Sequence, residues 1–204
     1  MIKKGKFITF EGIDGAGKSS HIEEVISFLE SKKIGVKRTR EPGGTRLGEK
    51  LRDLLLHDEM DPETETLLMF AARCQHIAEV IRPALNDGMF VVSDRFTDAT
   101  YAYQYGGKNV AYSKIEILEQ WVHPDLKADL TLLFDLPVEI SIERLSKNKI
   151  LDKFEKESEP FFNRLRNVYL DIARQNPNRY KIINANQAIE SVSRDVIEAV
   201  KNIL

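Results

Sequence analysis

Residues 12–19 read Gly-Ile-Asp-Gly-Ala-Gly-Lys-Ser, which is a complete G-x-x-x-x-G-K-[ST] pattern. Glycines let the backbone curl so that several N–H groups face one point, and a following helix adds the positive end of its dipole. In such a loop Lys18 reaches the β- and γ-phosphates of a nucleotide, and the Ser19 hydroxyl is a ligand for Mg²⁺. The pattern predicts binding of a nucleoside triphosphate; the alternative is a chance glycine-rich turn.

The residues that flank this loop favour nucleotide binding over a chance turn. Residues 6–10 form an apolar run typical of a buried strand, and the apolar positions of residues 22–29 recur at helical spacing. Strand-like runs then alternate with helical patterns along the whole chain. The predicted strands are 6–11, 35–40, 89–93, 130–135 and 180–184. The predicted helices lie near 18–33, 46–57, 63–87, 97–104, 112–122, 137–147, 158–175 and 187–203.

This alternation predicts an α/β fold: a three-layer, doubly wound sandwich around a five-stranded parallel sheet. Residues 89–92 and 130–134 are nearly continuous apolar runs, as expected where helices cover both faces of a parallel sheet. The length of 204 residues and the 42% of hydrophobic residues suit a single domain spanning 1–204. Ligands of such folds bind at the carboxyl ends of the strands.

Composition narrows the range of partners. The net charge of −2 gives no reason to expect a nucleic-acid partner, and we expect no signal peptide or membrane span. The lone cysteine, Cys74, excludes a disulfide framework and indicates a reducing, cytoplasmic location. We expect its side chain to be a small buried apolar group. The four histidines show no metal-ligand spacing.

Polar residues follow three of the predicted strands, where a ligand is expected. Glu11 and Asp14 follow the first strand, residues 40–45 (Arg-Glu-Pro-Gly-Gly-Thr) follow the second, and Asp94 and Arg95 follow the third. Asp94 is placed to hold Mg²⁺ directly or through water, and Arg95 offers a fork of donors to a second phosphate. The alternative for this acid–base pair is a surface salt bridge.

A second pocket is indicated on the helices. Phe70 and Arg73 are three residues apart and share a face, so a ring and a guanidinium there could stack on a base and bind its carbonyl edge. The alternative, which the sequence alone favours, is that Phe70 belongs to the core and Arg73 is solvated. Thr100, Tyr103 and Gln104 repeat this spacing, and ordinary amphipathic packing explains them equally well.

Residues 144–153 carry four cations between two helices: Arg144, Lys147, Lys149 and Lys153. Such a run is usually a solvated turn. In a phosphoryl-transfer enzyme it could instead belong to a mobile lid, here about 144–157, that closes over the triphosphate. Since the glycine-rich loop has no arginine, the charge of the transition state must be neutralised from elsewhere, and the lid is the nearest rich source of cations.

Taken together, these motifs resemble thymidylate kinases, the bacterial form most of all, over essentially the whole chain. The resemblance is carried by Phe10–Ser19, Arg40–Thr45, Phe70–Arg73, Asp94–Gln104 and Leu151–Glu155. It implies a P-loop kinase fold and transfer of the γ-phosphoryl group of ATP to dTMP, giving dTDP, in a Mg²⁺-dependent homodimer.

The resemblance also implies roles for individual residues. On the donor side, the residues that would hold ATP are Gly12, Ile13, Asp14, Gly15, Ala16, Gly17, Lys18, Ser19, Ser20 and Arg144. Arg144 would lie against adenine, with Asn184–Asn186 as the opposite wall, and Ser19 and Asp94 would serve the metal. On the acceptor side, the residues implied are Glu11, Asp14, Pro42, Phe70, Arg73, Arg95, Thr100, Tyr103 and Gln104.

Within the acceptor site, Phe70 would stack on thymine and Arg73 would bond its O4. Tyr103 would crowd the position of a 2′-hydroxyl, and Arg95 would hold the phosphate. Thr100 and Gln104 would line the base pocket, while Glu11 and Asp14 would order the acceptor side.

The lid departs from the family pattern. Bacterial members without an arginine in the phosphate loop usually have several in the lid, whereas here only Arg144 remains and lysines replace the others. Lysine supplies charge without a planar bidentate fork. We expect Lys153 or Lys149 to stabilise the transferring phosphoryl group, beside Lys18 and Arg95 as the other catalytic residues.

Two other functions remain open on the sequence. Another nucleotide or nucleoside kinase of this fold would prefer dUMP, dCMP or thymidine. A GTPase-like switch would lack an acceptor, but its Asn-Lys-x-Asp signature is absent, because residues 184–186 read Asn-Ala-Asn.

Overall fold

The computed structural model describes residues 5–147 and 152–204. In this part of the chain a parallel five-stranded sheet has the order β2-β3-β1-β4-β5. Its strands are β1 (Phe7–Glu11), β2 (Val36–Arg40), β3 (Phe90–Asp94), β4 (Leu130–Asp135) and β5 (Tyr180–Asn184). Each predicted strand is found to within one residue at either end. β1 and β4 are buried along nearly their whole length, which explains their continuous apolar runs.

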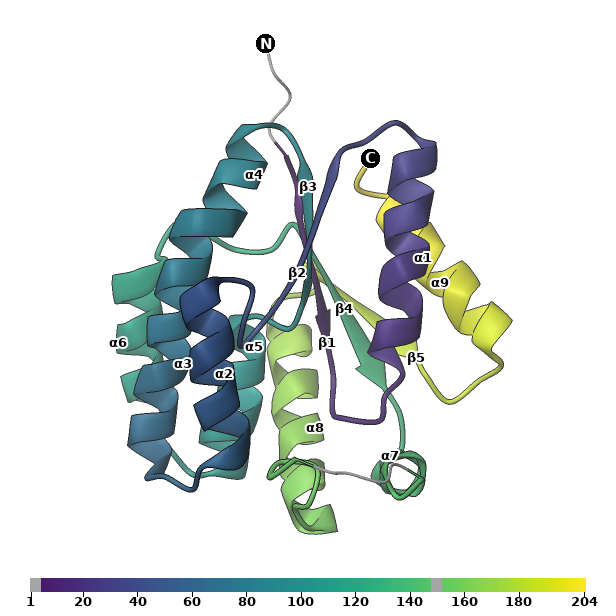
Figure 1. Cartoon of the computed structure of the whole chain (residues 1–204). Coiled ribbons are helices and arrows are strands. Elements are labelled where there is room, and N and C mark those ends of the chain that lie inside the picture. Colours follow the sequence, from purple (N-terminus) through teal and green to yellow (C-terminus); the bar gives the residue numbers. More distant parts are fainter. Residues whose placement is uncertain (1–4, 148–151) are drawn as a thin grey trace.

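Helices cover both faces of the sheet, so the predicted three-layer sandwich is confirmed (Figure 1). One face carries α1 (Lys18–Ser31) and α9 (Ile189–Lys201). The other carries α4 (Arg82–Asn86), α5 (Thr97–Thr100) and α8 (Glu159–Gln175). On that side α2 (Arg46–His57), α3 (Pro62–His76) and α6 (Tyr112–Val122) pack together, whereas α7 (Val138–Leu145) follows β4.

The predicted helix 63–87 is continuous but irregular. A π-helical segment, η1 (Ile77–Ile81), lies between α3 and α4. Pro83, near the start of α4, has no amide hydrogen for the i→i−4 bond to Glu79, and a π turn is a common way to accommodate such a gap. The helix predicted over 97–104 extends further in the structure, to Gly107, because η2 (Tyr101–Gly107) continues α5. Gly107 lets η2 approach α8 closely, since a Cβ there would lie 2.4 Å from the Phe161 ring.

The strand order places the glycine-rich loop at the point where the direction of winding reverses. β1 lies between β3 and β4, with Phe10 in register with Asp94 and Leu132. Crevices at such switch points are the usual ligand sites of open α/β sheets. None of the helices in the described residues is long and apolar enough to cross a bilayer.

The expectation for Cys74 is wrong, because its side chain is exposed. Arg73 and His76 occupy the inward face of α3 and are buried. Cys74 follows Arg73 by one residue, which turns it by about 100° around the helix axis and away from that face.

Candidate active site

The glycine-rich loop joins β1 to α1 and wraps around the N-terminus of that helix. Gly12, Gly15 and Gly17 have φ of 132°, 76° and 89°, values that L-residues with a side chain rarely adopt. Position 12 also lacks space, because a Cβ would lie 2.5 Å from the carbonyl oxygen of Phe134. The first turn of α1 has no side-chain cap, so its amide groups remain available to an anion.

The remaining loop residues divide between core and solvent. The side chains of Ile13 and Ala16 are buried and anchor the loop to the core. Ser19 and Ser20 are exposed at the start of α1 and line a cleft beside the loop. The loop therefore presents backbone amides and two hydroxyls to the cleft.

Lys18 begins α1 and is buried under the loop. Its Nζ donates hydrogen bonds to the carbonyl oxygens of Gly12 at 2.9 Å and Ile13 at 3.0 Å. Burial and the Arg95 guanidinium lower the pKa of Lys18 to about 8, against an opposing effect of Asp14. The ammonium is thus poorly solvated and bonded to neutral carbonyls, so an anionic phosphate nearby would be a much stronger partner.

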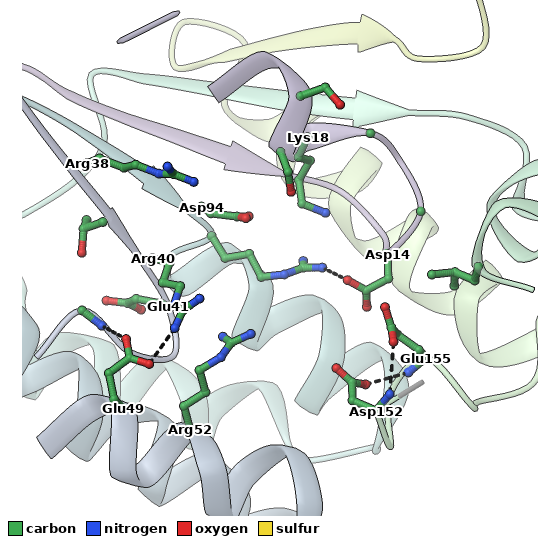
Figure 2. Close-up of a pocket in the computed structure, with 18 of the residues that line it drawn as sticks. Asp14, Lys18, Arg38, Arg40, Glu41, Glu49, Arg52, Asp94, Asp152 and Glu155 are labelled. Carbon is green, nitrogen blue, oxygen red and sulfur yellow. Dashed lines mark hydrogen bonds and ion pairs between the residues drawn. The ribbon is translucent and has the colours of Figure 1, made fainter. Parts of the chain in front are cut away.

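A polar cleft of about 840 Å³ opens beside the loop (Figure 2). Its walls come from the loop, the edge strand β2, α2, the end of β3 and the segments on either side of residues 148–151. The charged residues that line it are Asp14, Lys18, Lys37, Arg38, Arg40, Glu41, Glu49, Arg52, Asp94, Arg95, Arg144, Asp152 and Glu155. This mixture of cations and carboxylates suits a polyphosphate that brings a divalent cation with it.

Asp94 is the carboxylate best suited to that cation. It lies at the end of β3, and its Oδ1 is buried with no hydrogen-bond partner in the described part of the chain. Both Asp94 and Ser19 line the cleft. No group of three or more metal-ligating side chains occurs among the described residues, so a Mg²⁺ here would take its other ligands from phosphate and water. A buried, unpartnered oxygen on a residue that lines the same cleft as the Ser19 hydroxyl fits such an ion.

Arg95 is held in a fixed position by four partners. Its Nη1 donates to the Gly12 carbonyl oxygen at 2.9 Å and to the Tyr169 hydroxyl at 3.0 Å. Its Nη2 donates to Asp14 at 2.5 Å and to the Tyr103 hydroxyl at 2.8 Å. The backbone of Arg95 has φ of 69°, a strained value of the kind that clusters at functional sites. The guanidinium lies between the glycine-rich loop and the tyrosines.

Asp14 and Tyr103 complete this group. The Tyr103 hydroxyl donates to Asp14 Oδ2 at 2.6 Å, and its ring lies 4.8 Å from the Arg95 guanidinium carbon. Although burial opposes it, the Arg95 and Lys18 charges keep the pKa of Asp14 below its usual value. Asp14 therefore stays ionised and balances the charge of Arg95.

Glu11 is fully buried at the end of β1 and lines neither of the two cavities described in this section. Its Oε1 accepts from the Phe96 amide at 2.7 Å, and its Oε2 accepts from the Tyr169 hydroxyl at 2.9 Å. Since Tyr169 also binds Arg95, Glu11 is linked to the Arg95 guanidinium through one side chain. Burial, reinforced by the Asp98 carboxylate, raises the pKa of Glu11 to about 8.

This raised pKa predicts a pH-dependent stability. Between about pH 5 and pH 8 folded Glu11 holds a proton that the unfolded chain has released, so the free energy of unfolding falls as the pH rises. In the wild type we expect the free energy of unfolding to decrease by an amount on the order of a few kcal/mol over this range. In Glu11→Gln this decrease should be absent. Urea unfolding of both proteins at pH 5.5 and 8 measures the difference, and equal pH slopes would contradict the prediction.

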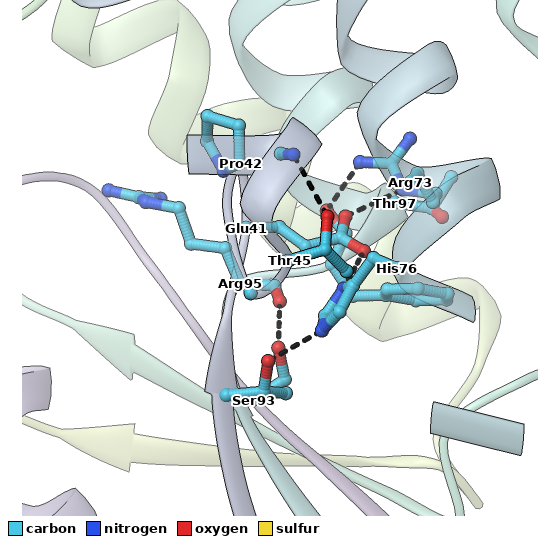
Figure 3. A network of polar contacts seen from close by, with 12 residues as sticks. Glu41, Pro42, Thr45, Arg73, His76, Ser93, Arg95 and Thr97 are labelled. Atoms are coloured by element: carbon cyan, nitrogen blue, oxygen red, sulfur yellow. Dashed lines mark hydrogen bonds and ion pairs between the residues drawn. The ribbon is translucent and has the colours of Figure 1, made fainter. Parts of the chain in front are cut away.

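A smaller cavity of about 90 Å³ lies beside the cleft. Its floor is a buried polar network around Glu41 (Figure 3). Arg73 Nε donates to Glu41 Oε2 at 2.7 Å, and His76 Nδ1 lies 2.8 Å from Glu41 Oε1. The nearby Arg73 charge and the His76 hydrogen bond lower the pKa of Glu41, despite its burial. The expectation of a solvated Arg73 is wrong, because this ion pair makes its burial possible.

One guanidinium nitrogen of Arg73 has no hydrogen-bond partner among the described residues. Its Nη2 donates to the Thr100 hydroxyl at 3.0 Å, whereas its Nη1 is buried without a hydrogen-bond partner in the described residues. Arg73, Thr100 and Gln104 all line the smaller cavity, as does Pro42. Phe70 is buried, as the alternative reading expected, and lies 4.7 Å from the Arg73 guanidinium carbon. It is not among the residues that line this cavity, so stacking on a base stays a prediction.

The two cavities adjoin, because five residues line both: Asp14, Glu41, Arg52, Arg95 and Asp152. Two of these are arginines. Arg52, which sequence reasoning missed, lies on α2 and donates from Nη1 to the Pro42 carbonyl oxygen at 2.9 Å. Burial and the nearby Arg40 charge lower the pKa of Arg52. Its place seven residues after Thr45, the N-cap of the helix that follows the Arg-Glu-Pro-Gly-Gly-Thr motif, is the signal that could have found it.

Of the predicted lid, residues 144–147 and 152–157 are described, whereas Lys149 lies outside the described residues. Lys153 Nζ pairs with Glu65 Oε2 at 2.7 Å and donates to the Asp58 carbonyl oxygen at 2.9 Å. It does not line the cleft. The structure thus places Lys153 against α3, and its catalytic role stays a prediction.

Arg144, for which a contact with adenine stays a prediction, binds two backbone carbonyl groups. Its Nη1 donates to the Gly15 carbonyl oxygen and its Nη2 to the Ala185 carbonyl oxygen, both at 3.3 Å. The guanidinium therefore bridges the glycine-rich loop and the predicted opposite wall, residues 184–186, and it lines the cleft.

Comparison with known proteins decides the family. A protein-family model described as thymidylate kinase matches residues 10–196 of this chain. The chain belongs to the thymidylate kinase family. A thymidylate kinase from Methylobacillus flagellatus is 60% identical over 198 residues, which are 97% of this chain and 98% of the relative. The thymidylate kinase from Bordetella pertussis is 50% identical over 204 residues, covering 100% and 98%.

Solved structures agree with this assignment. A crystal structure of thymidylate kinase from Ehrlichia chaffeensis superposes with a TM-score of 0.79 at 34% sequence identity, covering 97% of this chain and 99% of that one. The fold expected from the resemblance to thymidylate kinases, that of a P-loop kinase, is thereby confirmed.

Proposed function

We propose that the chain transfers the γ-phosphoryl group of ATP to dTMP and releases ADP and dTDP. The supporting observation is the pair of adjoining cavities, with a phosphate-binding loop in one and an unpaired Arg73 donor in the other. A GTPase-like switch needs no second cavity of this kind. We also propose that the enzyme is a single domain and acts in the cytoplasm.

On the donor side, the loop amides and Lys18 would bind the β- and γ-phosphates. Arg144 would contact adenine from its place between Gly15 and Ala185. Asp94 and the Ser19 hydroxyl would hold Mg²⁺, which when bound neutralises charge on the phosphates. Neither the loop nor its first helical turn supplies an arginine to the transferring group.

On the acceptor side, Arg95 and Arg52 at the junction would hold the phosphate of dTMP. One of its oxygens would attack the γ-phosphorus as the bond to the β-phosphate oxygen breaks. The attacking oxygen is already anionic, so the reaction needs no strong general base. The smaller cavity is far below the roughly 300–1,000 Å³ of typical ligand sites, so dTMP would also occupy the junction with the larger cleft.

A coupled assay of ADP release tests this function. The acceptors compared are dTMP, dUMP, dCMP, thymidine and no acceptor, each at the same ATP and Mg²⁺ concentrations. We expect the highest kcat/KM with dTMP and little ADP release without an acceptor. Preference for another acceptor would establish a different kinase, and acceptor-independent hydrolysis would favour a switch.

The proposed Mg²⁺ site predicts a specific defect. Asp94→Asn keeps the shape of the side chain but removes its charge, so the Mg²⁺ concentration at half-maximal rate should rise at least about tenfold. A Mg²⁺ titration at fixed ATP measures this value. Asp87→Asn, at an exposed position before β3, is the matched control and should leave it unchanged. An unaltered Mg²⁺ requirement in Asp94→Asn would remove Asp94 from the site.

We also propose a homodimer through the outer face of α3 and α6. Leu67 and Ile117, exposed by 56% and 65%, line an apolar groove of about 230 Å³, and Trp121, one turn after Ile117 on α6, is exposed by 80%. An apolar group of this kind on one face is typical of an interface. We expect Ile117→Asp to convert a dimer into a monomer in sedimentation-velocity runs. A wild-type monomer at micromolar concentration would contradict the proposal.

A further inference from the structure

Glu65 is a buried carboxylate of α3 that has no part in the roles assigned so far. Its side chain is 3% exposed, and its two oxygens bind different groups. Oε1 accepts from Gln104 Nε2 at 2.9 Å, whereas Oε2 pairs with Lys153 Nζ at 2.7 Å. Glu65 therefore lies directly behind a side chain that lines the smaller cavity.

The contact with Glu65 determines which way the Gln104 amide faces. A carboxylate paired with a lysine is only an acceptor, so the NH₂ group of Gln104 must point toward Glu65. The amide oxygen then lies on the other side of the group, away from Glu65. In the described part of the chain no hydrogen bond to this oxygen is found, so it remains free to accept one from a ligand in the cavity.

Arg73 adds the complementary group. Its buried, unpartnered Nη1 is a donor, so the cavity wall offers one donor and one acceptor. The Watson–Crick edge of thymine or uracil matches this pair, because O4 accepts and N3–H donates. Cytosine presents a 4-amino donor and an N3 acceptor, and it would leave both protein groups mismatched at a buried site.

We propose that Glu65 is a positioning residue that selects 4-keto pyrimidines by holding the Gln104 amide with its oxygen toward the base. This inference rests on the proposed function and names the residue that determines its base specificity. Glu65 lines neither cavity and would act on the base only through Gln104.

The test is Glu65→Gln, which keeps the shape of the side chain but offers both a donor and an acceptor to Gln104. The Gln104 amide is then free to turn its NH₂ group toward the base. We expect the ratio of kcat/KM for dTMP to that for dCMP to fall at least about tenfold. The change should lie in KM, with kcat for dTMP within about threefold of wild type, because Lys18 and Arg95 are untouched and Lys153 keeps an oxygen acceptor in the new amide at position 65.

A swapped variant, Glu65→Gln with Gln104→Glu, provides the rescue. In it the new amide on α3 can donate to the new carboxylate on η2 and accept from Lys153, so an acceptor oxygen again faces the base at the same total charge. We expect the dTMP preference to return to within about threefold of wild type. The matched control is Glu79→Gln, since exposed Glu79 also accepts from a glutamine amide, that of Gln75, but lies far along the helix from the cavity.

The outcomes separate the two proposals. An unchanged dTMP:dCMP ratio in Glu65→Gln, or a swapped variant no more selective than the single one, would overturn the role of Glu65. An equal loss of selectivity in Glu79→Gln would also overturn it. A wild-type protein inactive on dTMP would instead overturn the proposed function on which this role rests.

Discussion

Replacing Lys18 with alanine is expected to lower kcat about 10²–10³-fold while the fold stays intact. The ammonium is buried and bonded to two carbonyl oxygens of its own loop, so its loss removes a pre-positioned charge at the phosphates. No other lysine in the described residues lines the cleft at the loop itself, because Lys37 comes from β2. The two arginines that contact the loop, Arg95 and Arg144, are held by hydrogen bonds of their own and do not take the place of the buried ammonium.

ADP release at saturating ATP and dTMP measures the effect. Lys32→Ala, at the opposite end of α1, is the control and should retain wild-type turnover, since its side chain is exposed and remote from the loop. Thermal melting of both variants checks the fold. Near wild-type turnover in Lys18→Ala would show that the glycine-rich loop does not bind the transferred phosphate in this way.

Replacing Arg95 with alanine should lower kcat/KM for dTMP at least about a hundredfold. Arg95 lies at the junction of the two cavities, where the proposed function places the acceptor phosphate next to the donor. Its loss removes the bidentate donor for the phosphate. It also leaves the negative charge of Asp14 without its arginine partner, so Asp14 repels the incoming phosphate. Affinity for ADP should change little, since the loop amides and Lys18 remain.

Arg95→Lys separates charge from geometry. Lysine restores a cation but cannot bind Asp14, Tyr103 and a phosphate with one planar group, so we expect only partial recovery of kcat/KM. Isothermal titration with ADP reports the donor site in each variant. Full activity of Arg95→Ala on dTMP would assign the acceptor phosphate to Arg52 alone.

Local sequence patterns were enough to predict most of the fold. The complete motif at residues 12–19 and the alternation of apolar runs with helical stripes depend on neighbours along the chain, so strands and helices were placed closely. The family resemblance and the position of polar residues after β1, β2 and β3 then indicated the site. Residue roles within it, including those of Lys149 and Lys153, stay predictions.

The tertiary structure decided what depends on contacts between distant segments. Nothing in the spacing of Phe70 and Arg73 reveals that Glu41, 32 residues away, neutralises the guanidinium and lets it be buried. Arg52 and Glu65 are likewise ordinary helical residues in the sequence. Their proposed roles arise only because folding brings α2 to the junction of two cavities and α3 behind Gln104.

The sequence by itself thus determined the phosphate-binding loop, the α/β sandwich and the family, because each depends on the types and spacing of residues that are close together along the chain. Which charges are buried, which are paired and which donors stay free was decided only in three dimensions. The physical reason is that the energy of a buried charge depends on partners that packing, rather than chain order, brings within hydrogen-bond distance.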